Sequence, residues 1–133
     1  MKKRDRKNAG FTMVELVVVM VIVGILATIS VPMYRNYIQR ARAQEGVALV
    51  GSVASAQRVY YAEFGSFYAV GNTGYDATLG VDAQANSYFT TYSVTVAGDS
   101  FTVTSDGTGD AAGLTVTATG GAGAPTNIDV IGL

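Results

Sequence analysis

Residues 10–32 read GFTMVELVVVMVIVGILATISVP, and this stretch decides how the rest of the chain is organised. Between Leu16 and Val31 it holds no charged residue and consists mostly of Val, Ile, Leu and Met. One acid, Glu15, stands close to its start. An ionisable side chain in such a segment costs roughly 2.5–3.5 kcal/mol at the centre of a bilayer on insertion scales, and it usually marks function. Glu15 is therefore the first functional clue.

A basic leader precedes this stretch and leaves several interpretations open. Residues 1–8 hold five basic residues and one acid, and positive charge ahead of an apolar run keeps that end in the cytoplasm. A secretory signal peptide is one interpretation, but the small-x-small site at residues 41–43 lies well beyond the run. A plain membrane anchor is another, since roughly 20 apolar residues span a bilayer. That anchor leaves Glu15 and the Gly10–Phe11 junction unexplained.

Composition excludes most enzyme chemistry. The chain has 133 residues, enough for one domain, with no Cys and no His. Disulfides, thiolate nucleophiles and the commonest general base and metal ligand are therefore missing. We predict a protein that is not an enzyme and has no cofactor. From Phe11 onward the chain has four basic and nine acidic residues. The mature body therefore lacks a basic patch, and we do not expect it to bind nucleic acid.

Residues 10–16, GFTMVEL, behind a basic leader and ahead of a run that ends at Pro32, closely resemble the N-terminal signature of the type IV pilin-like family. This family includes type IV pilins and the pseudopilins of type II secretion. The resemblance covers about the first 45 residues, where Gly, Phe, Glu and Pro all fall at the family's spacing. The family commonly has Leu-Ile or Leu-Val where Met13-Val14 stands, which is a mild departure.

The resemblance implies how the N-terminus is used. A prepilin peptidase would cut between Gly10 and Phe11, and the new amino group of Phe11 would be N-methylated. Gly10 would leave the scissile bond accessible. Glu15 would register the subunit by pairing with the Phe11 ammonium of a neighbour, since a paired buried charge recovers much of its desolvation cost. Gly24 and Pro32 weaken a helix, and the resemblance implies that the helix between them loosens in a filament.

Fold, partners and location follow from the same resemblance. The expected fold is α+β, with a long N-terminal helix whose first half is transmembrane-like and whose second half packs on a small antiparallel sheet. The expected partners are further copies in a helical filament, prepilin peptidase, the inner-membrane assembly platform and the inner membrane before assembly. The chain would cross that membrane once with a cytoplasmic N-terminus, and later join an extracellular pilus or a periplasmic pseudopilus.

The pattern divides the chain into five segments: a cleaved leader (1–10), a filament-core helix (11–32), an amphipathic helix (33–64), a connecting loop (65–87) and a sheet head (88–133). The loop should hold little regular structure. Alternating residues and a Gly98-Asp99 turn predict three or four antiparallel strands in the head. The buried stripe of the amphipathic helix is predicted from apolar residues at steps of three or four: Leu49, Val53, Ala56, Tyr60 and Phe64.

We predict from these features a structural pilin of a type IV pilus, serving attachment, motility or DNA uptake. The alternative is a pseudopilin of a type II secretion system. Asp106, Asp110 and Asp129 are candidate calcium ligands, because carboxylate oxygens suit calcium and major pseudopilins carry such a site in the corresponding tail. Their spacing fits that pattern poorly, and Asp in turns usually serves turn chemistry.

Overall fold

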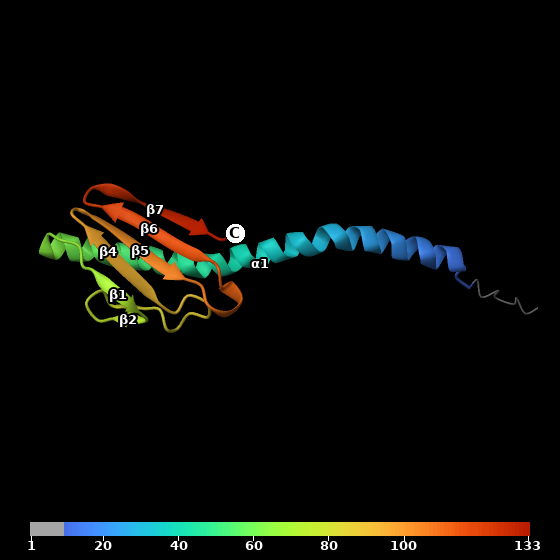
Figure 1. The fold of residues 1–133 in the computed structure, drawn as a ribbon, viewed down its shortest axis with the longest axis horizontal. Coiled ribbons are helices and arrows are strands. Elements are labelled where there is room, and N and C mark those ends of the chain that lie inside the picture. The colour runs from blue at the N-terminus through green and yellow to red at the C-terminus, as the bar shows by residue number, and fades with distance from the viewer. Residues whose placement is uncertain (1–9) are drawn as a thin grey trace, which may run out of the picture. The chain divides into compact units, whose positions relative to one another are not determined.

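A computed structural model describes residues 10–133. The leader predicted at residues 1–10 therefore lies outside the described residues except for Gly10. The chain divides into two compact units, one reaching to Arg35 and one formed by residues 36–133. Helix α1 (Met13–Phe64) contributes to both, since it runs for 52 residues without a break (Figure 1). The continuous helix predicted from the sequence is confirmed, with its start two residues later than expected.

The second unit contains a five-stranded antiparallel sheet in the order β1-β4-β5-β6-β7. A separate two-stranded ladder is formed by β2 and β3, and a short 3-10 helix, η1 (Gly109–Ala111), precedes β6. The strands are β1 (Val70–Thr73), β2 (Tyr75–Asp76), β3 (Val81–Asp82), β4 (Tyr92–Ala97), β5 (Ser100–Asp106), β6 (Thr115–Gly121) and β7 (Ala124–Ile131).

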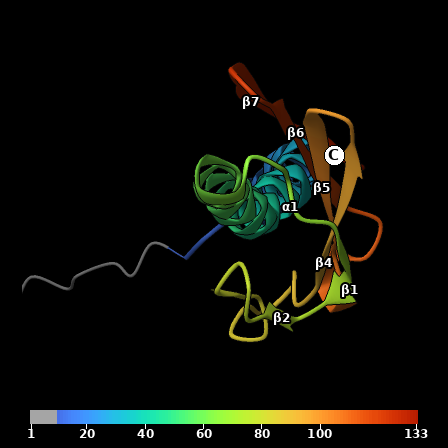
Figure 2. The ribbon, with the colours of Figure 1, turned by 90° about the vertical axis from the view of Figure 1, so that its left-hand side faces the viewer.

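The second half of α1 lies against one face of this sheet (Figure 2). Strand residues alternate between the two faces, so every second side chain meets the helix. The buried members include Tyr92, Val103 and Val116, each fully buried. The other face carries a row of paired polar residues, such as Thr95 opposite Thr102 and Thr102 opposite Thr119. This arrangement is the predicted α+β fold, in which a long N-terminal helix packs on a small antiparallel sheet.

The buried stripe of the helix differs from the predicted one. Leu49 and Val53 are buried as expected, but Tyr60 is only partly buried and Phe64 is exposed. The buried face runs instead through Ala43, Gly46, Leu49, Val50, Val53, Ala54 and Gln57. The polar Gln57 is fully buried because its side chain hydrogen-bonds to both backbone groups of Tyr68, at 2.6 Å to the carbonyl and 2.9 Å from the N–H. An apolar pattern could not find that position.

The segment 65–87 holds more structure than predicted. Strands β1, β2 and β3 all fall inside it, and β1 pairs with β4 at the edge of the main sheet. The sheet accordingly has five strands instead of three or four. The Gly98-Asp99 turn is confirmed, since β4 and β5 pair on either side of it and Gly98 has a φ of 58°. Positive φ favours Gly because it has no Cβ.

Gly46 lets the helix approach the sheet closely. A Cβ built on Gly46 would lie 2.8 Å from side-chain atoms of both Phe89 and Val116. Phe89 and Val116 are fully buried, so neither has room to retreat. The absence of a side chain at this position therefore sets the distance between α1 and the sheet.

Candidate functional site

Helix α1 begins with a reciprocal set of hydrogen bonds between Thr12 and Glu15. The Glu15 carboxylate oxygen Oε2 accepts from the backbone N–H and from the hydroxyl of Thr12, each at 2.8 Å. The Glu15 N–H in turn donates to the Thr12 hydroxyl oxygen at 3.3 Å. This is a capping box, in which an N-cap Thr and a Glu three positions later satisfy each other's unpaired groups. The acid is therefore held at the very start of the helix by its own chain.

Thr12 is a residue that the sequence interpretation missed, although the signal was present. The pattern Thr-x-x-Glu directly before an apolar run is the usual signature of a capping box. It gives Glu15 a local role that does not compete with a role in assembly, because one oxygen, Oε1, makes none of the hydrogen bonds described at this helix end. Glu15 can thus cap its own helix and still accept a bond from a neighbour.

The predicted processing junction is open. Gly10 lies before the helix and is exposed, and a Cβ built on it would meet no atom of the described residues within 4 Å. Phe11 is 83% exposed. The fold of the described chain therefore gives no reason for Gly at position 10, because any side chain would fit there. A requirement for Gly10 has to come from a partner that reads this junction.

Within residues 10–133, the apolar half of α1 leaves its large side chains mostly exposed. Every large apolar side chain from Phe11 to Met33 is at least 50% exposed. Among the described residues, α1 is the one helix long and apolar enough to cross a membrane. Exposed apolar surface on this scale marks a surface that is covered in use, by lipid or by another protein. We therefore expect the residues of this half to contact lipid or another protein.

Gly24 and Pro32 both lie inside the continuous helix. Between them stand the two hydroxyl residues of the apolar run. Thr28 donates to the carbonyl of Gly24 at 2.9 Å, and Ser30 donates to the carbonyl of Leu26 at 2.8 Å. Pro32 has no N–H, so the Thr28 carbonyl lacks its usual partner four residues on. The two hydroxyl protons go to the carbonyls of Gly24 and Leu26, so neither serves the Thr28 carbonyl. In an apolar environment a carbonyl freed by Pro can be satisfied by neighbouring helices or ordered water.

Polar contacts fasten the second half of α1 to the head. Arg42 forms an ion pair with Asp110 at 3.0 Å and donates to the Asp110 carbonyl at 2.7 Å. Glu45 accepts the backbone N–H groups of Tyr88 at 2.6 Å and Phe89 at 2.9 Å. Burial raises the pKa of Glu45, but these backbone hydrogen bonds outweigh it and hold the pKa below its ordinary value. These groups hold the fold together and are not arranged around a ligand.

The three calcium candidates are not brought together. Asp106 accepts from the Thr115 hydroxyl at 2.7 Å, and Asp110 is paired with Arg42. Asp129 accepts the N–H of Val130 at 3.0 Å. Within residues 10–133 the structure contains no cluster of three or more acidic side chains that could hold a metal ion. Each carboxylate therefore serves local structure, as Asp residues near turns usually do.

Two family descriptions match the chain, one after the other. "Prokaryotic N-terminal methylation motif" matches residues 5–31. "Type IV minor pilin ComP, DNA uptake sequence receptor" matches residues 32–122, which is more than half of the chain. The first match covers the junction and the apolar half of α1, and the second covers most of the head.

Curated relatives are pilins. The chain is 35% identical over 108 residues to the fimbrial protein EcpC of Eikenella corrodens, covering 79% of this chain and 67% of the relative. It is 41% identical over 58 residues to the type IV major pilin protein PilE1 of Neisseria gonorrhoeae, covering 44% and 35%. It is 52% identical over 40 residues to the type IV major fimbrial protein FimA of Dichelobacter nodosus, covering 30% and 25%. The chain thus spans 67% of the length of the first of these relatives, 35% of the second and 25% of the third. No solved structure matches.

Proposed function

The chain belongs to the type IV pilin family, and from that premise we propose that it is a structural subunit of a type IV pilus filament. The observation that carries the proposal is the half-helix from Phe11 to Met33, whose large apolar side chains are all at least half exposed. Lipid would cover this surface in storage, and the same surface of other copies would cover it in the filament. Relatives that are structural pilins support a role without catalysis.

Maturation of the subunit would take place at Gly10–Phe11. A prepilin peptidase would cut between these residues, and the amino group of Phe11 would be N-methylated, as the match to a methylation motif supports. The open junction favours this assignment, since the chain's own fold makes no demand on Gly10. The chain would be held in the inner membrane with a cytoplasmic N-terminus until the assembly platform extracts it.

Assembly would depend on Glu15. The new Phe11 ammonium of one subunit would donate to Glu15 of its neighbour, because two opposite charges in an apolar core are far less costly together than apart. The capping box supports this, since it fixes the Glu15 carboxylate on the first turn through one oxygen. Loosening of the helix between Gly24 and Pro32 would lengthen the subunit under load, and the Thr28 and Ser30 hydroxyls could keep their bonds to the carbonyls of Gly24 and Leu26 as the backbone bonds open.

The pseudopilin alternative is not favoured, because the relatives are fimbrial proteins and major pilins. DNA uptake remains one use of the proposed filament, since the description that matches residues 32–122 names a DNA uptake sequence receptor. Direct contact of this head with DNA is not part of the proposal. From Phe11 onward the chain carries four basic and nine acidic residues, and Arg42 is already paired with Asp110. A nucleic-acid surface requires a patch of several basic groups that can contact successive phosphates.

Substitution Glu15→Leu tests the assembly role. The variant should insert in the membrane and fold its head normally, yet form few or no filaments, because no carboxylate receives the neighbour's ammonium. Filaments are counted by electron microscopy of sheared cells, and membrane content by immunoblot. Glu63→Leu is the matched control, since Glu63 is an exposed acid near the other end of the same helix. Wild-type filament numbers in Glu15→Leu would refute the proposal.

A further inference from the structure

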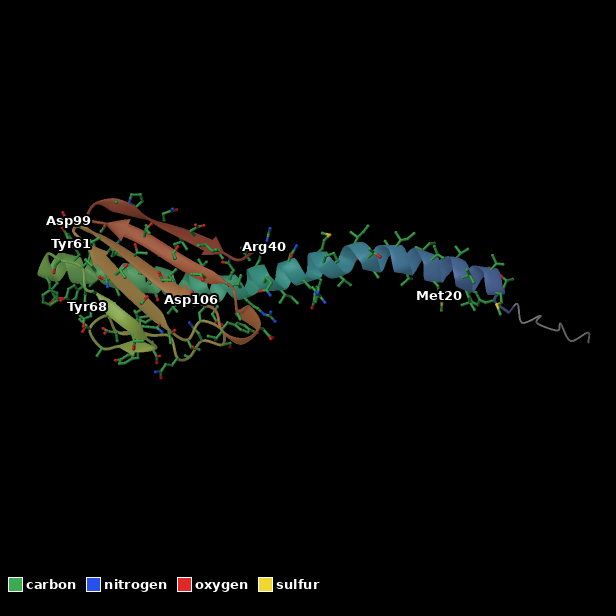
Figure 3. All side chains as sticks on the ribbon, in the orientation of Figure 1. Met20, Arg40, Tyr61, Tyr68, Asp99 and Asp106 are labelled. Carbon is green, nitrogen blue, oxygen red and sulfur yellow. The ribbon has the colours of Figure 1, made fainter. Side chains whose placement is uncertain are left out.

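A cleft of about 390 Å³ lies where the second half of α1 meets the end of the sheet. Three segments that are far apart in the sequence line it: Asn36, Gln39 and Arg40 of the helix, residues 112–114 before β6, and residues 132–133 after β7. Arg40 can be seen at this place in Figure 3. Gly132 and Gly113 touch so closely that a Cβ on Gly132 would overlap the Gly113 carbonyl oxygen. The backbones of these two segments therefore lie side by side at the wall of the cleft.

The cleft offers one positive charge with polar groups beside it. Arg40 is exposed, and within residues 10–133 it takes part in no ion pair, in contrast to Arg42 two residues on. None of the described side chains that line the cleft is acidic. The guanidinium of Arg40 and the amide of Asn36 can both donate to an anionic oxygen. A guanidinium is especially suited to phosphate, because its donors form a planar fork.

Gln39 adds an acceptor that the chain leaves unsatisfied. Its Oε1 atom is buried and has no hydrogen-bond partner among the described residues. A buried acceptor without a partner costs about 1–3 kcal/mol. The terminal torsion of Gln is soft, so a small rotation can turn this oxygen toward the cleft. A ligand with an N–H donor beside its phosphate would relieve the cost.

The place of the cleft along the helix indicates where such a ligand is found. The hydrocarbon core of a bilayer is about 30 Å thick, which takes about 20 helical residues. Residues 13–32 fill that length, and Asn36, Gln39 and Arg40 follow shortly after them along the same helix. Phospholipid head groups occupy that depth on either side of the core. This step rests on the proposed storage of the subunit in the inner membrane.

We propose that the cleft binds a phospholipid head group of the phosphoethanolamine type. Arg40 and Asn36 hold the phosphate, and the ammonium donates to Gln39 Oε1 turned toward the cleft. A choline head group cannot make the second contact, because its nitrogen carries no hydrogen. Head-group binding would orient the stored subunit at the membrane surface and would end when the subunit leaves the membrane.

Titration of the full chain in nanodiscs tests the proposal. Discs of phosphatidylcholine are compared with discs containing increasing phosphatidylethanolamine or phosphatidylglycerol, and the NMR signals of the Gln39 side-chain amide, Gly113 and Gly132 are followed. We expect saturating shifts with phosphatidylethanolamine and none with phosphatidylcholine alone. Equal responses to the ethanolamine and choline lipids would overturn the proposal, as would a response to phosphatidylglycerol that equals that to ethanolamine.

Two variants and a control locate the contact. Arg40→Gln should weaken the response about tenfold or more, because it removes a charge-assisted hydrogen bond. Gln39→Leu should remove the preference for ethanolamine over choline. Arg35→Gln removes a cation from the same helix outside the cleft, and it should leave the response unchanged. An effect of Arg35→Gln equal to that of Arg40→Gln would show diffuse attraction to the membrane and refute a defined site.

A solution measurement separates the lipid from free phosphate. The chain in detergent is titrated with glycerophosphoethanolamine and, separately, with inorganic phosphate. Saturation by the first at concentrations where phosphate gives no shift supports head-group recognition. Equal saturation by both would make the cleft a general anion site and overturn the proposal. Glu15→Leu should bind as wild type, so loss of filaments and loss of lipid binding are distinguishable failures.

Discussion

The two halves of α1 are equally regular helices whose side chains meet very different surroundings. In the first half, the large apolar side chains from Phe11 to Met33 are all at least 50% exposed, whereas Val50 and Val53 in the second half are fully buried under the sheet. The second half is therefore constrained by the chain's own core. In the proposed function the first half is constrained instead by lipid, by a peptidase and by other copies. A substitution should affect stability in one half and processing or assembly in the other.

Two glycines give the sharpest contrast between the halves, and the largest expected effect. Gly10→Val should abolish cleavage of the leader almost completely, because a branched side chain would block the peptidase. The free energy of unfolding should not change, since a Cβ at Gly10 meets nothing within 4 Å. Immunoblots would detect the uncleaved form, and mass spectrometry would detect the missing methylated Phe11 terminus.

Gly46→Val should have the opposite effects, a loss of stability without a loss of cleavage. Its side chain would collide with Phe89 and Val116, so the head should lose about 1–3 kcal/mol or more through overpacking. Cleavage at Gly10 should continue in whatever protein remains. If Gly10→Val matured normally, the Gly10–Phe11 junction ahead of the helix would not be a peptidase signal.

Gln57→Leu should give the largest loss of stability among polar residues of the second half. Replacing the amide leaves the backbone N–H and carbonyl of Tyr68 without their partners, at a cost of about 2–4 kcal/mol in the free energy of unfolding. Thermal or denaturant unfolding of the full chain in detergent measures the loss. Gln44→Leu, on the exposed side of the same helix, should change stability by less than about 0.5 kcal/mol. Similar losses in the two variants would contradict the role of Gln57.

Much of this contrast could be predicted from the sequence. The long helix, the apolar run and the alternating strands follow from periodicity, because each element shows its own repeat. The helix stripe is predicted correctly at Leu49 and Val53 but not beyond them, because Gln57 is polar and yet fully buried. Strands β2 and β3 have only two residues each, which is too short for any alternation to be recognised.

The candidate sites also differ in whether the sequence alone could predict them. The roles of the Gly10–Phe11 junction and of Glu15 stay predictions, which rest on a pattern local in the sequence. The capping box of Thr12 is equally local and could have been predicted. The cleft at Arg40 could not, because its walls come from residues near 36, 113 and 132. Only the folded topology brings these segments together. The separation of Asp106, Asp110 and Asp129 could be learned only from the structure for the same reason.

Acid should weaken the head through Glu45. The folded-state pKa of Glu45 lies below its ordinary value of about 4.3, so its contribution to stability is complete above that pH. The contribution is lost as pH falls through the lower folded-state pKa, because the unfolded chain then binds the proton more readily. The free energy of unfolding, plotted against pH between about 5 and 2, should therefore have a smaller slope in Glu45→Gln than in wild type. An unchanged slope would mean that Glu45 is not the group responsible for the loss of stability in acid.

Thr12→Val should have the smallest effect and the most local one. Valine keeps the shape of threonine but removes the hydroxyl that bonds to Glu15, while the backbone N–H bond to the carboxylate stays. Loss of an N-cap side chain costs about 1 kcal/mol, so first-turn amides should exchange hydrogen about fivefold faster. Filament yield should fall less than in Glu15→Leu, since the carboxylate that receives the neighbour's ammonium remains. Thr28→Val removes a hydroxyl farther along the helix and should leave first-turn exchange unchanged. If Thr12→Val abolished filaments as fully as Glu15→Leu, Thr12 would also be required for assembly. The conformation of the first turn would then matter for contact with the neighbouring subunit as well as for capping.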